Sequence, residues 1–460
     1  MALRALRAVA LVGLVLGLVG PERVAAAGPP VETGVSADGA AFLIEVPDNW
    51  NGTLVLYSHG YVAPGQANPP TDAGDPVTRA FLLGNGYALA GSAYASTGWA
   101  VKDALRDQID LLDHFTAAHG APKRTIAWGH SLGGMITAGL VQRDPGRFAG
   151  ALPMCGVLAG GVGVWNSALD SEFVFKTLLA PNDADLHLVN ITDPFTEPHS
   201  NVGEAFRVLG AAQTTPQGRA RLALAAAVGD LPGWFDPQSP EPAANDFVSR
   251  LANQIQWDRQ PDFIFSFGLR AELEARAGGN PSWNTDVDYR ELLERSVDRA
   301  EVRALYDAAG LDLEQDLETL RAAPRIAADP AAVDYLSQNI VFNGDLGGVP
   351  VLTMHTTGDG LVANQDEQAY ASIVEDRREL LRQVFVHRAG HCAFTPAETV
   401  AAFDALVRRI DTGRWSGVGA AALNHAAAAL PQLNVLFAGP SFIPFRPTEF
   451  LRPFSLQDED

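Results

Sequence analysis

The chain has 460 residues, of which 47% are hydrophobic and 19% are charged. This composition excludes an intrinsically disordered chain, and only two cysteines exclude a disulfide-rich scaffold. The formal net charge is −21, and a field of that sign repels the phosphates of nucleic acids and of anionic lipids. We therefore expect no nucleic-acid partner and interpret the charge as favouring solubility.

The first 27 residues have the pattern of a secretory signal peptide. Arg4 and Arg7 precede an apolar run over 8–19, and a stretch of small residues follows over 24–27. The run is short for a membrane span. The sequence thus predicts export to the extracellular space or the periplasm, with no stable membrane anchor after cleavage; an uncleaved anchor is the alternative.

Strands and helices alternate through the next part of the chain. Apolar, β-prone runs predict strands at 42–46, 53–58, 86–91, 124–128 and 148–154. Apolar residues at helical spacing predict helices over 101–118 and 131–143. The same signals resume with strands at 349–355 and 382–387 and helices over 364–374 and 396–410. This alternation predicts an α/β fold, with a mostly parallel sheet and helices on both faces.

A mainly helical block interrupts the alternation. Helical periodicity is visible at 204–212, 217–228, 262–277 and 302–309. We expect a signal peptide (1–27), a first core segment (28–156), a helical cap or lid (157–345) between the sixth and seventh sheet strands, a second core segment (346–412) and a C-terminal arm (413–460). The arm, rich in Ala, Pro and Phe, is interpreted as irregular and packed on the surface; a partner-binding tail is the alternative.

One motif carries the chemistry. Residues 128–134 read Trp-Gly-His-Ser-Leu-Gly-Gly and contain G-x-S-x-G between a predicted strand and a predicted helix, the context that this motif requires. The turn is so tight that the residues two before and two after Ser131 must be small, and Gly129 and Gly133 meet this requirement. It exposes the Ser131 hydroxyl and directs the N-terminus of the following helix at the reaction centre. A helix N-cap is the alternative role for Ser131.

An acid and a base follow in the expected order. Asp359 comes directly after the strand at 349–355, and His391 follows the strand at 382–387. The order Ser131, Asp359, His391 is that of α/β-hydrolases. Over residues 31–156 and 346–411 the chain resembles a secreted α/β-hydrolase-fold serine hydrolase of the esterase and lipase kind. The resemblance gives no subfamily.

The resemblance implies a catalytic mechanism. His391 would take the Ser131 proton, and Asp359 would orient the imidazole and stabilise its charged form. The backbone N–H groups of Leu132 and Tyr61 would form the oxyanion hole, and the Tyr61 ring would cover the acyl group.

Several residues compete for these roles. Asp366 and Glu367 are later candidates for the acid, and His387 is the rival base. His59 is interpreted as fixing the oxyanion loop, and His130 as shaping the pocket. His355 is expected to end its strand near the acid loop. No metal site and no dinucleotide fingerprint are evident, so we predict a hydrolase without a cofactor.

The two cysteines both fall at the predicted catalytic edge of the sheet. Cys155 ends a strand and Cys392 directly follows the proposed base, so an exported protein would join them in a disulfide. The alternative is two buried free thiols. The tannase and feruloyl esterase group also has a Cys after its His, paired to a Cys before its Ser. Here His130 precedes Ser131, so that pattern is half met.

The cap is expected to cover Ser131 and to set substrate choice. Its aromatic residues are candidate pocket residues: Trp165, Phe173, Trp257, Phe263, Phe265, Phe267 and Trp283. We predict cleavage of a small-molecule or polymeric carboxylic ester through an acyl-enzyme. A peptidase or amidase on the same fold and a non-catalytic binding protein are the alternatives. The sequence does not specify the ester or the oligomeric state.

Overall fold

The computed structural model describes residues 31–196, 200–374 and 377–455. Its centre is a nine-stranded sheet in the order β1-β2-β4-β3-β5-β6-β7-β8-β9. The strands are β1 (Val31–Val35), β2 (Ala41–Glu45), β3 (Thr53–Ser58), β4 (Ala88–Ser92), β5 (Arg124–His130), β6 (Gly150–Met154), β7 (Val351–Gly358), β8 (Leu381–Ala389) and β9 (Phe442–Ile443). The central pairs are parallel, whereas β1, β2 and β9 pair antiparallel toward the edges. This is the α/β-hydrolase fold, as predicted.

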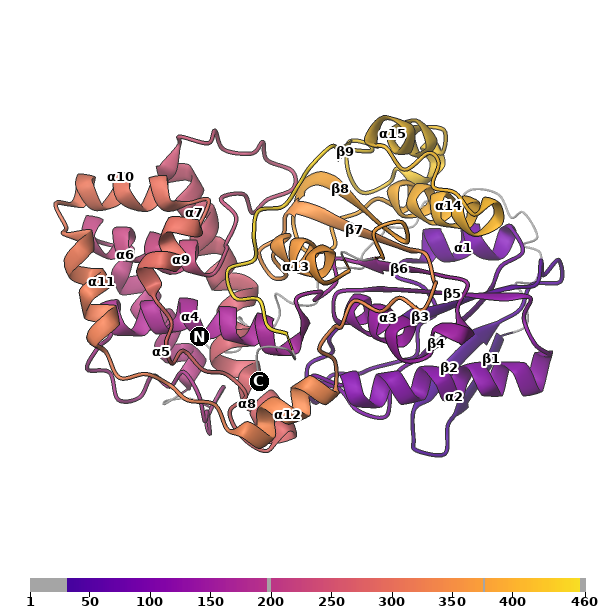
Figure 1. Ribbon diagram of the computed structural model, residues 1–460, viewed down its shortest axis with the longest axis horizontal. Helices are drawn as coiled ribbons and strands as arrows, with labels where there is room; N and C mark the ends of the chain where they lie inside the picture. Colours follow the sequence, from indigo (N-terminus) through magenta and orange to yellow (C-terminus); the bar gives the residue numbers. More distant parts are fainter. Residues whose placement is uncertain (1–30, 197–199, 375–376, 456–460) are drawn as a thin grey trace, which may run out of the picture.

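Helices cover both faces of the sheet (Figure 1). One face packs against α2 (Val101–His119) and α3 (Leu132–Arg143), and the other packs against α1 (Pro76–Gly84) and α14 (Pro396–Thr412). All six residues of β3 are buried, because a strand covered on both sides contacts the core with every side chain. The helix α13 (Gln365–Ile373) follows β7.

The insertion between β6 and β7 forms a helical lobe beside the sheet (Figure 1), which confirms the predicted cap. Its helices are α4 (Gly160–Leu179), α5 (Asn201–Ala212), α6 (Pro216–Val228), α7 (Phe247–Trp257), α8 (Arg270–Ala277), α9 (Tyr289–Arg295), α10 (Arg299–Ala309), α11 (Leu313–Ala322) and α12 (Pro330–Gln338). The lobe has a hydrophobic core of its own. Between α7 and α8 the chain winds as π-helix at Asp258–Asp262 and Phe265–Leu269, with Pro261 inside the first segment.

The prediction of an irregular C-terminal arm is wrong for part of that segment. It contains a helix, α15 (Ala420–Ala428), and β9, which pairs with β8 through Phe385–Ile443 and Val386–Phe442. Two residues are too few for the alternating pattern that predicts a strand. The chain then runs back between the sheet and the cap (Figure 1).

The described residues include no helix that is long and apolar enough to cross a membrane. The predicted signal peptide over 1–27 lies outside them.

Candidate active site

Ser131 stands at the turn between β5 and α3 with φ 58° and ψ −126°, a conformation that costs energy for a residue with a side chain. The turn depends on two glycines. A Cβ on Gly129 would lie 2.6 Å from the Ser58 carbonyl oxygen, and one on Gly133 would lie 2.6 Å from the His59 oxygen. Only glycine fits these positions, so the steric demand predicted from the motif is met.

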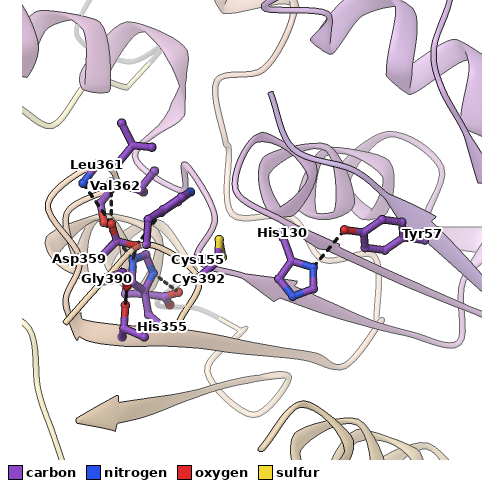
Figure 2. Close-up of a disulfide and its surroundings, with 12 residues drawn as sticks. Tyr57, His130, Cys155, His355, Asp359, Leu361, Val362, Gly390 and Cys392 are labelled. Carbon is purple, nitrogen blue, oxygen red and sulfur yellow. Dashed lines mark hydrogen bonds and ion pairs between the residues drawn. A yellow bond between two sulfur atoms is a disulfide. The ribbon is translucent and has the colours of Figure 1, made fainter. Parts of the chain in front are cut away.

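The predicted acid and base are hydrogen-bonded to each other. His391 Nδ1 lies 2.7 Å from Asp359 Oδ2, and the backbone N–H groups of Leu361 and Val362 donate to Asp359 Oδ1 at 3.1 Å each. Asp359 is buried. Its carboxylate is therefore fixed by three donors, and it holds the imidazole in one orientation. Figure 2 shows the acid loop and these bonds.

His391 Nε2 is buried and has no hydrogen-bond partner among the described residues. The structure thus contains the acid–base hydrogen bond but no Ser131–His391 hydrogen bond. Without a bound substrate, hydrogen bonds between catalytic groups are often longer than in the reacting complex.

A second histidine lies behind the acid, at the place the sequence indicates. His355 is fully buried, with Nε2 3.4 Å from Asp359 Oδ2 and Nδ1 3.3 Å from Glu367 Oε1. Burial alone would lower the pKa of His355, but the two carboxylates raise it to about 10. Burial alone would raise the pKa of Asp359, but His391 and His355 hold it well below its ordinary value. Glu367, a rival acid, is thus engaged with His355.

The loop after β3 lies against Ser131, the predicted nucleophile. A Cβ on Gly60 would lie 3.2 Å from Ser131 Cβ. His59 Nδ1 is 2.7 Å from the Gly60 oxygen, and its ring stacks on Tyr94, whose hydroxyl donates to the His59 carbonyl at 3.1 Å. These contacts agree with a structural role for His59 in fixing the loop that carries the Tyr61 N–H.

The predicted disulfide is present and joins Cys155 to Cys392 with a Cα–Cα distance of 5.3 Å. Cys155 follows β6, and Cys392 follows His391. The disulfide lies between the acid loop and His130 (Figure 2), so it fastens the loop of the base to the strand beside the nucleophile.

A cavity of about 140 Å³ opens onto Ser131. Its wall includes Tyr61 and Leu132, the predicted oxyanion donors, and Trp165, a predicted pocket residue. Two predicted pocket residues lie elsewhere. Phe173 stacks on Tyr289 inside the cap at 5.3 Å, and His130 is 3.3 Å from the Tyr57 hydroxyl and does not belong to the wall. Burial lowers the pKa of His130 to about 4.

The structure also places the other cap aromatic residues and the rival base. Of the other cap aromatics, Phe263 and Phe265 belong to the cavity wall, whereas Trp257, Phe267 and Trp283 do not. His387, the rival base, packs against Trp234, lies 3.5 Å from Glu241 and does not belong to the cavity wall.

Sequence reasoning missed the four carboxyl groups in the cavity wall as a set. Glu172, Asp258 and Asp262 come from the cap, and Asp366 comes from α13. The sequence predicts Asp366 only as a rival acid, whereas in the structure its Oδ1 accepts from the Ala159 N–H at 3.0 Å. The detectable signal was the spacing of Asp258 and Asp262, four residues apart beside a run of phenylalanines.

Comparisons with known proteins identify the family of the chain. The model of a tannase-like family of unknown function matches residues 37–378. The chain is 31% identical over 428 residues to an o-phthalyl amidase of Xanthobacter agilis, covering 86% of this chain and 91% of the relative.

Two solved structures are similar at lower identity. Feruloyl esterase B of Aspergillus oryzae has a TM-score of 0.38 at 15% identity and covers 84% of this chain and 81% of its own. An esterase of the same organism has a TM-score of 0.41 at 14% identity and covers 84% and 80%. The family model spans most of the chain, and the amidase is aligned over nearly its whole length. The chain therefore belongs to the tannase-like family of α/β-hydrolases.

Proposed function

We propose that this hydrolase cleaves carboxylic esters through an acyl-enzyme formed on Ser131. The observation that carries the proposal is the presence of Ser131 on the tight turn after β5 in the same chain as the His391–Asp359 hydrogen bond of 2.7 Å. A serine hydroxyl is a weak nucleophile at neutral pH and needs a base held in the correct tautomer.

The proposed reaction has two halves. His391 Nε2 accepts the Ser131 proton as Oγ attacks the substrate carbonyl, and the Tyr61 and Leu132 N–H groups stabilise the resulting oxyanion. His391 then donates its proton to the leaving oxygen, and the acyl-enzyme remains. Water, activated by the same imidazole, hydrolyses it. Asp359 keeps Nδ1 protonated throughout and stabilises the imidazolium.

Amide hydrolysis is the second candidate, and one observation favours it: the relative at 31% identity is named an o-phthalyl amidase. The same groups serve an amide, with proton donation to the leaving nitrogen becoming more important. An o-phthalyl amide is therefore the first amide to test.

The test combines covalent labelling with paired substrates. A fluorophosphonate probe should label the protein but not Ser131→Ala. Ser167→Ala is the matched control, because Ser167 also lies in the cavity wall. Each acyl group is then offered as its p-nitrophenyl ester and its p-nitroanilide, together with the o-phthalyl amide. Esters hydrolysed faster than anilides support the proposal. Faster amide cleavage replaces it with the amidase, and neither labelling nor cleavage by folded protein refutes both.

We also propose that the protein is exported and that its first 27 residues are removed. The disulfide agrees with an oxidising compartment. Mass spectrometry of the protein recovered from culture medium or periplasm should give an N-terminus near residue 28. A full-length cytoplasmic product would contradict export.

A further inference from the structure

The cavity over Ser131 is lined by more carboxyl groups than cationic side chains. Glu172, Asp258, Asp262 and Asp366 contribute to its wall, and no Lys or Arg among the described residues does. Arg270, which lies outside the wall, forms an ion pair with Glu172 Oε2 at 3.6 Å, and His355 behind the wall acts on Asp366. Buried carboxyl groups are unfavourable unless a cation or a hydrogen-bond donor compensates them.

Several of these carboxyl oxygens have no donor. Glu172 is 2% exposed, and neither of its oxygens has a hydrogen-bond partner in the described chain. Asp366 is fully buried, and its Oδ2 has no partner, although Oδ1 is bonded to Ala159. The buried Oδ2 of Asp262 also has none. Unsatisfied buried acceptors are rare in folded proteins, and these line a cavity that ends at the nucleophile.

The backbone around the cap carboxyls is unusual as well. Asp258 and Asp262 are the first and last residues of a π-helical segment that contains Pro261. Such bulges occur frequently at functional sites. Here the bulge places two carboxyl groups of one segment in the cavity wall.

We propose that this cavity binds a substrate whose acyl or leaving group carries a protonated amine, and that Glu172, Asp262 and Asp366 receive its N–H donors. The inference rests on the proposed function and names the substrate class of the same site. An engineered cavity of about 150 Å³ holds one benzene ring, so the part of the substrate that this cavity encloses is about the size of a single ring.

Protonation of the carboxyl groups in the cavity wall provides a second, independent way to test the proposal. Burial raises the pKa of Glu172 to about 8, of Asp258 to about 8 and of Asp366 to about 7, and it raises that of Asp262 well above its ordinary value. Near neutral pH these carboxyl groups therefore remain largely protonated without a ligand. A bound ammonium group favours their ionised form, so its binding should release protons. The charged groups around these carboxyls are Arg270, Asp170 and Glu274 near Glu172, and His355, Glu367 and Asp359 near Asp366 and Asp262.

The first test compares p-nitrophenyl benzoates that differ only in the para substituent: aminomethyl, hydroxymethyl, ethyl or carboxylate. Each kcat/KM is divided by the hydroxide-catalysed rate of the same ester. Hydrogen bonds to charged groups lead us to expect the aminomethyl ester to be preferred over the ethyl ester by at least about 10-fold. Asp366→Asn and Glu172→Gln should each reduce this ratio. The control Asp404→Asn, a carboxyl of α14 outside the cavity wall, should keep it. A preference for carboxylate or ethyl, or equal rates for aminomethyl and hydroxymethyl, would overturn the proposal.

The second test does not depend on turnover. Ser131→Ala is titrated with 4-methylbenzylamine and with 4-methylbenzoate by calorimetry at pH 6.5 in two buffers of different ionisation enthalpy. The amine should bind with release of protons, and the benzoate should bind more weakly. Failure of the amine to bind refutes the inference. Amine binding by a protein that cleaves no ester or amide would refute the proposed function alone, and ester cleavage without cation preference would refute the inference alone.

Discussion

Removal of the disulfide should weaken both the fold and the catalytic loop. The bond joins residues 237 apart, and this loop contains the whole cap and Asp359. The chain-entropy expression for a loop of that length gives about 5 kcal/mol of stabilisation at 25 °C, the upper end of measured disulfide effects. We expect Cys155→Ala/Cys392→Ala to lose about 3–5 kcal/mol of unfolding free energy. Because Cys392 follows His391, kcat should fall as well.

Urea unfolding followed by circular dichroism measures the first quantity, and initial rates on the best p-nitrophenyl ester measure the second. The native protein treated with a phosphine reductant is the matched control. It should approach the variant in both quantities, whereas the reductant should leave the variant unchanged. A variant as stable and active as the native protein would refute the reasoning. Equal effects of the reductant on both proteins would show that the crosslink is not the cause.

Three further perturbations test the remaining geometry. Gly133→Ala should abolish hydrolysis or folding, because its Cβ would lie 2.6 Å from the His59 oxygen; circular dichroism and rates distinguish the two outcomes, and an active variant would contradict the turn geometry. Asp359→Asn should reduce kcat by about 10⁴-fold with little change in fold, since His391 loses its correct tautomer; near-native rates would exclude Asp359 as the acid. The raised pKa of His355, about 10, adds stability that is complete below pH 6.5 and is lost as the pH rises through 10. His355→Gln should therefore flatten the decrease in melting temperature between pH 7 and 10, and an unchanged slope would contradict a protonated His355.

The core was predictable because its signals are local. A strand buried on both faces is a continuous apolar run, as in β3, and the parallel arrangement follows from alternation with helices. Ser131 is predictable as the proposed nucleophile from the steric requirement for glycine around it, and Asp359 and His391 are predictable as the proposed acid and base from their positions after β7 and β8. Edge strands were not evident. The exposure of β1 alternates between exposed and half-buried, and β9 has two residues.

The cavity wall was harder to predict because it is assembled from distant segments. Glu172 and Asp262 are charged residues of the cap, and the usual position of such residues in a helix is the solvated face. For Asp366, the order of motifs suggests only one role, that of an alternative acid to Asp359. Nothing in the local sequence indicates that these three side chains line one cavity. The prediction for Phe173 is wrong in the opposite direction. Phe173 is predicted to line the pocket but packs inside the cap, because an aromatic residue in a helical block is more often part of that block's own core.

The proposed chemistry and the proposed selectivity therefore have different structural origins. Ser131, His391 and Asp359 follow strands of one sheet, so their relative positions are set by strand pairing and the disulfide. Two of the three unsatisfied carboxyls lie on the cap, which packs around a separate hydrophobic core. Changes in the cap can alter which substrate arm is accepted without moving the acid–base pair. Glu172→Gln should accordingly change the ratio between cationic and neutral esters, whereas Asp359→Asn should lower both rates by the same factor.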